Sequence, residues 1–272
     1  MQYQKCPICS SSSQFIFNSK HKKSIYECSN IICGHLFTPI EKETQGICER
    51  ATNIEDESDE FLRIYNERNI RLLKLFNKRL AKNSLPVKLL DFGAGNAHIS
   101  RSIKKKLGDK CVIYCIESNP ICFDLYSKYQ LTQIKRIEDL KEKVDLIYMI
   151  EVIEHLEDPI TTLKNLSSKL TQGGFIFLST PLGKSEESST IAYDTKSHLH
   201  FFTERSLNLA LKKAGLLEIK YQFFPQMYPL PEKWPLLLNY ARITKSFLKK
   251  LLGSLGSKNR VSHLVGFTKK ID

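Results

Sequence analysis

The sequence has no long apolar run. No stretch approaches the roughly 18 consecutive apolar residues that a membrane-spanning helix needs. The amino terminus also lacks a charged and then apolar leader that ends at a small-residue cleavage site. We therefore expect a cytoplasmic protein. The eight cysteines of such a chain are expected to be reduced thiols or metal ligands rather than disulfides.

Acidic residues are few relative to basic ones. The chain has 29 Asp and Glu residues against 41 Lys and Arg residues, which gives a net charge of +12. This charge fits an anionic partner such as nucleic acid, a nucleotide-linked substrate or a membrane surface, and it equally fits solvated basic faces. The sequence contains no Arg-rich or aromatic-interleaved stripe typical of RNA-binding surfaces, so we do not expect a nucleic-acid partner.

Four cysteines near the amino terminus form two pairs: Cys6, Cys9, Cys28 and Cys33. Two turns that each present two thiolates can close a tetrahedral zinc site. The spacing therefore predicts a zinc-ribbon-like element over residues 1–40, with zinc as a structural ion. Four residues instead of the common two separate the second pair. A remnant without metal, or His35 in place of one sulfur, remains an alternative.

The rest of the chain alternates between apolar strands and helices. Residues 41–57 are polar, acidic and aperiodic, which indicates a linker, and apolar residues at helical spacing predict a helix over 58–82. Beyond them, strands are expected at 87–92, 111–117, 132–137, 145–150, 175–180, 218–224 and 264–269. Alternation of strands with helices predicts a parallel sheet with right-handed crossovers. At 272 residues, one α/β domain with a small appendage can bury a full core.

The first expected strand runs into a glycine turn. Gly93 and Gly95 stand where a buried strand must turn sharply into a helix, and glycine permits positive φ and close approach of a ligand. Free N–H groups of the following helix favour a ligand carboxylate or phosphate. A dinucleotide-binding turn would have a third glycine where this chain has His98, so pyrophosphate binding is disfavoured. An ordinary loop is the alternative.

An acidic residue ends the second expected strand. Glu117 lies about twenty residues past the glycines, where this kind of fold places a side chain that accepts hydrogen bonds from ribose hydroxyls. A surface carboxylate at a strand end is the alternative interpretation.

Two blocks of the sequence carry a family resemblance: residues 91–97 read Asp-Phe-Gly-Ala-Gly-Asn-Ala, and residues 151–159 read Glu-Val-Ile-Glu-His-Leu-Glu-Asp-Pro. The first block resembles the first motif of class I S-adenosylmethionine-dependent methyltransferases, with Ala97 in place of the last glycine. The second block looks like the fourth motif of the same family. The resemblance covers about residues 58–272 and implies a Rossmann-like α/β fold, with a seven-stranded, mostly parallel sheet and helices on both faces.

The same resemblance implies S-adenosyl-L-methionine as cofactor and a small-molecule acceptor, such as a small metabolite, a sugar or a lipid precursor. The residues expected to bind the cofactor are Asp91, Gly93, Gly95, Asn96, Glu117, Glu138 and Glu151. Two other functions are kept as alternatives. One is an RNA methyltransferase, and the other is a non-catalytic, zinc-anchored interaction protein on a methyltransferase scaffold.

Three histidines follow the strand ends that should line the cofactor crevice. His155 follows the fourth strand, and His198 and His200 follow the fifth. A neutral imidazole there can take the proton from an attacking hydroxyl. We prefer His200 as this base, because alternation puts it and His198 on one side of an extended segment. Roles in packing a helix or ordering a loop are the alternatives.

Residues 225–260 form an insertion between the last two strands. The segment is basic and amphipathic, so it could lie on an anionic membrane, cover the active site or make a dimer contact. The oligomeric state does not follow from these patterns.

Overall fold

The computed structural model describes residues 4–19, 22–39, 86–183, 197–219, 222–224 and 263–271. The expected linker, the expected helix at 58–82 and the 225–260 insertion lie outside these ranges, as does most of the loop before His198. Within the described ranges no helix is long and apolar enough to span a membrane.

The larger sheet in the described part of the chain has the strand order β11-β12-β9-β8-β5-β6-β7. Its strands are β5 (Val87–Phe92), β6 (Cys111–Ile116), β7 (Thr132–Gln133), β8 (Val144–Ile150), β9 (Leu170–Pro181), β11 (Gln222–Phe224) and β12 (His263–Lys269). Strands β5 to β9 pair in parallel, whereas β12 is antiparallel to both β9 and β11. The prediction of an α/β fold built on a parallel sheet is confirmed.

Helices cover both faces of this sheet. They are α2 (His98–Leu107), α3 (Phe123–Lys128), α4 (Pro159–Ser168) and α6 (Glu204–Lys213), with short 3-10 helices η3 (Gly108–Lys110), η4 (Pro120–Cys122), η5 (Ile137–Asp139) and η6 (Ile153–His155). In β5, Leu89 packs with residues of α2 and α3, while the next residue, Leu90, packs with residues of α4 and α6. Successive strand residues point to opposite faces, so a continuous apolar strand suits burial on both sides.

Strand β9 begins at Leu170, five residues earlier than the sequence predicts. Residues 171–174 form a bulge in this strand: the pairing with β8 passes from Leu170 to Phe175, and Gly173 has a φ of 79°. Strand β7 is shorter than expected and ends at Gln133. The shorter β7 moves Glu138 from the expected strand end into η5, whereas β5 and β8 end where the sequence predicts.

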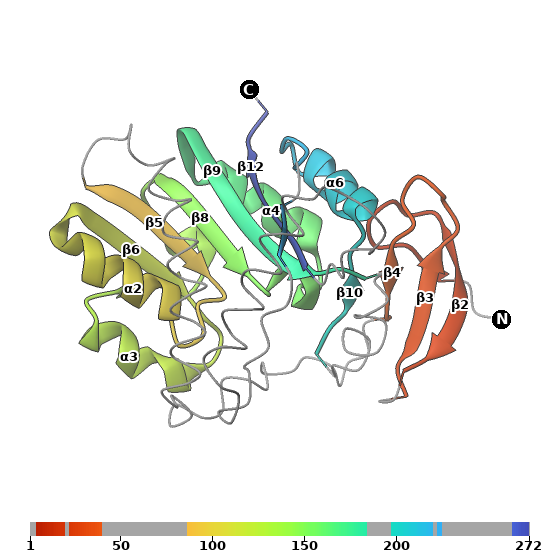
Figure 1. Ribbon diagram of the computed structural model, residues 1–272, viewed down its shortest axis with the longest axis horizontal. Helices are drawn as coiled ribbons and strands as arrows, with labels where there is room; N and C mark the ends of the chain where they lie inside the picture. Colours follow the sequence, from red (N-terminus) through yellow and green to blue (C-terminus); the bar gives the residue numbers. More distant parts are fainter. Residues whose placement is uncertain are drawn as a thin grey trace, which may run out of the picture.

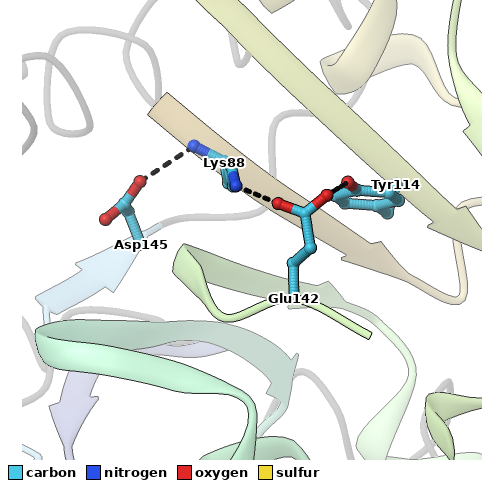
Figure 2. A network of polar contacts seen from close by, with 4 residues as sticks. All are labelled: Lys88, Tyr114, Glu142 and Asp145. Atoms are coloured by element: carbon cyan, nitrogen blue, oxygen red, sulfur yellow. Dashed lines mark hydrogen bonds and ion pairs between the residues drawn. The ribbon is translucent and has the colours of Figure 1, made fainter. Parts of the chain in front are cut away.

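A polar network fixes the strands at the opposite, amino-terminal edge (Figure 2). The Lys88 backbone N–H donates to Asp145 Oδ2 at 2.8 Å, and the Lys88 ammonium pairs with Glu142. The Tyr114 hydroxyl donates to the same Glu142 at 3.0 Å. Exposed ion pairs of this kind contribute at most about 1 kcal/mol. The main consequence is that β5, β6 and β8 share a fixed register.

The smaller sheet joins the amino-terminal segment to the rest of the protein. It has the order β1-β2-β3-β4-β10, with β1 (Gln4–Lys5), β2 (Ser12–Asn18), β3 (Ser24–Cys28), β4 (Leu36–Phe37) and β10 (His200–Phe201). The first four strands, with the loops between them, are called the ribbon below. Strand β10 pairs antiparallel with β4, so main-chain bonds hold the ribbon beside α6 and β10 (Figure 1). The sequence analysis did not predict this pairing.

Candidate functional site

The glycine turn follows β5 at the carboxyl edge of the larger sheet. Gly93 has a φ of 74°, and a Cβ at that position would lie 2.5 Å from Cγ2 of Val152. Gly95 has a φ of 50°, and a Cβ there would meet no described atom within 4 Å. Gly93 is therefore required by the packing of the turn against the segment after β8, whereas Gly95 leaves its side of the turn open to a ligand.

Glu117 joins this turn to the end of β6. Its Oε2 accepts the Gly95 N–H at 2.7 Å, and its Oε1 accepts the N–H groups of Ser118 and Asn119 at 2.8 and 2.9 Å. Oε1 also accepts the Ser118 hydroxyl at 3.2 Å, so it receives three donors, whereas among the described residues Oε2 receives the Gly95 N–H alone and keeps a lone-pair position for a further donor. The role predicted for Glu117, binding ribose hydroxyls, stays a prediction.

Asp91 lies beneath the turn with 7% of its surface exposed. Its Oδ2 accepts the Ser100 hydroxyl at 2.5 Å. Burial raises the pKa of Asp91 to about 7, the Ser100 hydrogen bond opposes that rise, and the negative charge of Glu117 adds to it. A cationic ligand near this carboxyl group would favour its charged form.

The remaining residues expected at the cofactor differ in setting. Asn96 Oδ1 lies 3.4 Å from the Cys122 thiol, and Glu138 is exposed in η5. Glu151 directly follows β8 and has a φ of 58°, and its Oε1 accepts the Ser179 hydroxyl at 2.6 Å. A positive φ is uncommon for residues other than glycine, and such strain gathers at functional sites. The sequence gives no signal of this conformation.

His155 and His198 come together beside a buried acid. Their ring centroids lie 4.7 Å apart at an interplanar angle of 70°. Glu154, with 1% exposure, accepts the Thr180 hydroxyl at 3.0 Å, and its carbonyl accepts the Leu199 N–H at 2.8 Å. One ligand atom from each of Glu154, His155 and His198 lies within 4.8 Å of the others. The sequence analysis did not single out Glu154, although it lies inside the block at 151–159.

His200 has a different environment. Its Nε2 lies 2.8 Å from the Leu156 carbonyl and its Nδ1 lies 3.0 Å from His35 Nε2. A carbonyl only accepts, so the proton is on Nε2 and the Nδ1 lone pair receives the His35 N–H. Burial lowers the pKa of His200 to about 4, despite the opposing bond to Leu156. Both ring nitrogens of His200 are engaged in hydrogen bonds. In this arrangement the ring offers no lone pair to the proton of an acceptor hydroxyl, which the predicted general-base role would require.

The four ribbon cysteines converge as the sequence predicts. The Sγ atoms of Cys6 and Cys33 lie 3.8 Å apart, those of Cys9 and Cys28 lie 3.3 Å apart, and all four are within 4.8 Å of one another. A tetrahedral site with Zn–S bonds of about 2.3 Å spaces its sulfurs by about 3.8 Å. The cysteines are free thiols, and the donor set fits zinc. His35 bonds to His200 instead of joining this group.

The larger sheet has helices on both faces, a glycine turn after β5 and acids directly after β6 and β8. This arrangement is that of the doubly wound α/β proteins, which bind nucleotide-containing ligands at the carboxyl edge of the sheet. Residues 62–219, more than half of the 272 residues, match the family described as a methyltransferase domain, so the chain belongs to this family. The chain therefore carries a methyltransferase domain.

Curated relatives match parts of the chain. A tRNA U34 carboxymethyltransferase from Wolinella succinogenes is 29% identical over 98 residues, which is 34% of this chain and 35% of that protein. Its Campylobacter hominis counterpart is 40% identical over 52 residues, 19% of this chain and 18% of that protein. A ubiquinone biosynthesis O-methyltransferase from Parvibaculum lavamentivorans is 28% identical over 120 residues, 40% of this chain and 47% of that protein. The matches thus span less than half the length of these relatives.

Solved structures share the fold. A SAM-dependent methyltransferase from Archaeoglobus fulgidus is 19% identical with a TM-score of 0.53, over 76% of this chain and 94% of that chain. The cyclase SpnF is 14% identical with a TM-score of 0.50, over 74% of this chain and 80% of that chain. At these identities the likeness extends to the fold alone.

Proposed function

We propose that this methyltransferase transfers a methyl group to a hydroxyl group of a small-molecule acceptor. The observation that carries the proposal is the cluster of Glu154, His155 and His198. A hydroxyl is a weak nucleophile at neutral pH and reacts well only when it loses its proton, so an oxygen acceptor needs such groups. The ubiquinone biosynthesis O-methyltransferase that matches 120 residues of the chain supports an oxygen acceptor, because its name describes such a reaction.

The cofactor site and the cluster lie on one continuous segment. Val152, which packs against Gly93 of the turn, is two residues before Glu154. The cofactor supplies an electrophilic methyl group. We propose that Glu117 binds its ribose, that Gly93 and Gly95 permit its close approach, and that the other cofactor-side residues orient it: Asp91, Asn96, Glu138 and Glu151. Holding two reactants in line can supply about 7 to 11 kcal/mol of the barrier reduction.

His155 has a defined tautomer in this scheme. Its Nδ1 lies 3.0 Å from the carbonyl of Ser197, and a carbonyl only accepts, so the proton is on Nδ1. The lone pair of His155 is therefore on Nε2. In the reaction the acceptor hydroxyl loses its proton at the cluster, the oxygen lone pair forms the bond to the methyl carbon, and the carbon–sulfur electron pair stays with sulfur.

We also propose that Cys6, Cys9, Cys28 and Cys33 hold one structural zinc ion, which their sulfur spacing supports. A small ribbon has little apolar core of its own, so the ion would supply much of its folding free energy. Because β4 pairs with β10, a folded ribbon would also fix the position of the segment before β10, which carries His198.

An RNA acceptor is the second candidate. The net charge of +12 and the tRNA-modifying names of two relatives favour it. The test gives the full chain S-adenosylmethionine with a labelled methyl group, together with either unmodified tRNA or a panel of phenols, sugars and lipid precursors. Label in a small-molecule product supports the proposal, whereas label in ribonuclease-sensitive material overturns it in favour of RNA.

A further inference from the structure

The geometry points to a second metal site in this protein, in which Glu154, His155 and His198 bind one divalent transition-metal cation beside the acceptor. The inference deepens the proposed function, since it states how an acceptor hydroxyl would lose its proton. One ligand atom from each of the three residues lies within 4.8 Å of the other two. They come from two segments, η6 and the residues before β10, that a main-chain hydrogen bond from Leu199 to Glu154 holds together.

Two of the three ligands, Glu154 and His155, are each held by a further contact. Thr180 donates its hydroxyl to Glu154 Oε2 at 3.0 Å. The Ser197 carbonyl accepts from His155 Nδ1 at 3.0 Å, which keeps the His155 lone pair on Nε2. Metal-binding histidines generally donate their other ring N–H to a carbonyl or carboxylate in this manner. The supporting contacts of a metal site are therefore present around Glu154 and His155.

Burial and charge favour a cation in this cluster. Glu154 is 1% exposed and His198 is 9% exposed, and the rings of His155 and His198 meet edge to face. Burying a carboxylate is costly unless charge or hydrogen bonds compensate for it, and a divalent cation supplies the charge. Two imidazoles and one carboxylate suit Zn²⁺, Mn²⁺ or Fe²⁺ better than Mg²⁺ or Ca²⁺, which prefer oxygen ligands.

The cluster lies close to the residues proposed to bind the cofactor. Consecutive residues of β9 hold the two acids of the segment after β8, because Ser179 donates to Glu151 and Thr180 donates to Glu154. Three protein ligands leave a coordination position open, as in catalytic zinc sites. A hydroxyl that contacts the cation has a lowered pKa, so it releases its proton to solvent near neutral pH before its oxygen attacks the methyl carbon.

The test uses the full chain with its ribbon loaded with zinc, and titrates it with Mn²⁺ while the free Mn²⁺ signal is followed by electron paramagnetic resonance. Thiolate sites favour zinc, so Mn²⁺ reports on the nitrogen and oxygen ligands. Wild-type protein should bind about one Mn²⁺, and Glu154→Gln and His198→Ala should each weaken that binding at least tenfold. Glu157→Gln, an exposed carboxylate on the same segment, is the matched control and should bind as wild type does.

Calorimetry with S-adenosylhomocysteine on the same samples shows whether each variant is folded. A wild-type protein that binds no Mn²⁺ overturns the inference whatever the variants do, as does equal binding by wild type, Glu154→Gln and His198→Ala. Loss of methyl transfer in His155→Ala without any Mn²⁺ binding in wild type would assign direct proton transfer to His155. Mn²⁺ binding combined with methyl transfer into RNA would leave this site standing and remove the proposed acceptor class.

Discussion

His35 of the ribbon donates a hydrogen bond from Nε2 to Nδ1 of His200, over a distance of 3.0 Å. The Leu156 carbonyl fixes the tautomer of His200 from the other side. The His35 ring also packs on Phe202, with centroids 4.9 Å apart, so the contact is both polar and apolar. Through this pair the ribbon contacts the segment that carries His198.

The first prediction concerns this pair. His35→Ala and His200→Ala should each lower the free energy of unfolding, because each leaves a buried ring nitrogen without its partner. The double variant should lose less than the sum of the two, with a coupling of about 0.5 to 1.5 kcal/mol. Urea unfolding of the four proteins measures the cycle. Strict additivity would mean that the two rings contribute independently.

The turn after β5 gives the second prediction. Gly93→Ala should destabilise the protein by at least about 1 kcal/mol more than Gly108→Ala. Both glycines have positive φ, but an added Cβ meets Val152 at position 93 and no described atom within 4 Å at position 108. Adding Val152→Ala to Gly93→Ala should recover part of the loss. Equal melting temperatures for the two single variants would contradict this account.

The third prediction is a pH dependence. Burial raises the pKa of Asp91 to about 7 in the folded protein from an ordinary value of 3.8, so the folded state binds this proton more tightly than the unfolded chain. The resulting stability is full below pH 3.8 and is lost as pH rises to about 7. The contribution of Asp91 to the free energy of unfolding amounts to about 4 kcal/mol at most.

Asp91→Asn should therefore flatten the stability profile between about pH 4 and pH 7 in protein without cofactor. Denaturant unfolding at several pH values measures the slopes. The Asn side-chain oxygen can still accept the Ser100 hydroxyl, so the variant isolates the titration. Parallel slopes for variant and wild type would assign the pH dependence to other groups.

For cofactor affinity, the fourth prediction compares two acids. Glu117→Gln should weaken cofactor binding at least about tenfold, because it removes charge-assisted hydrogen bonds worth about 1.5 to 3 kcal/mol. Glu142→Gln at the opposite edge of the sheet, in the network of Figure 2, should leave the dissociation constant unchanged. Calorimetry with S-adenosylhomocysteine measures both. Unchanged affinity in Glu117→Gln would make Glu117 a brace of the turn only.

The fifth prediction tests the ribbon. Cys9→Ser should lose about one zinc ion per chain relative to wild type, because three sulfurs cannot complete the tetrahedral site. Cys111→Ser, a buried cysteine at the start of β6, should keep the wild-type zinc content. Elemental analysis after dialysis against a weak chelator gives the counts. Equal zinc in the two variants would rule out the four-sulfur site.

The parallel strands were predictable because burial on both faces imposes continuous apolar runs such as that of β8. The convergence of the four cysteines was predictable because each pair lies at one short turn, the first between β1 and β2 and the second between β3 and β4. The pairing of β4 with β10 was not predictable. Each strand has two residues, and no local pattern encodes a partner so distant along the chain. Glu154 was missed for a related reason: it lies in η6, and its partner Thr180 lies on β9, 26 residues further along the chain.

The same β4–β10 pairing constrains the order of folding during synthesis. His35 and His200 are 165 residues apart, so a ribosome adding 5 to 20 residues per second takes on the order of ten to thirty seconds between them. During that interval the ribbon emerges before β10 exists. A ribbon that fills with metal early would wait as a preformed template, and docking of β10 onto β4 would then be a late event in the maturation of the enzyme.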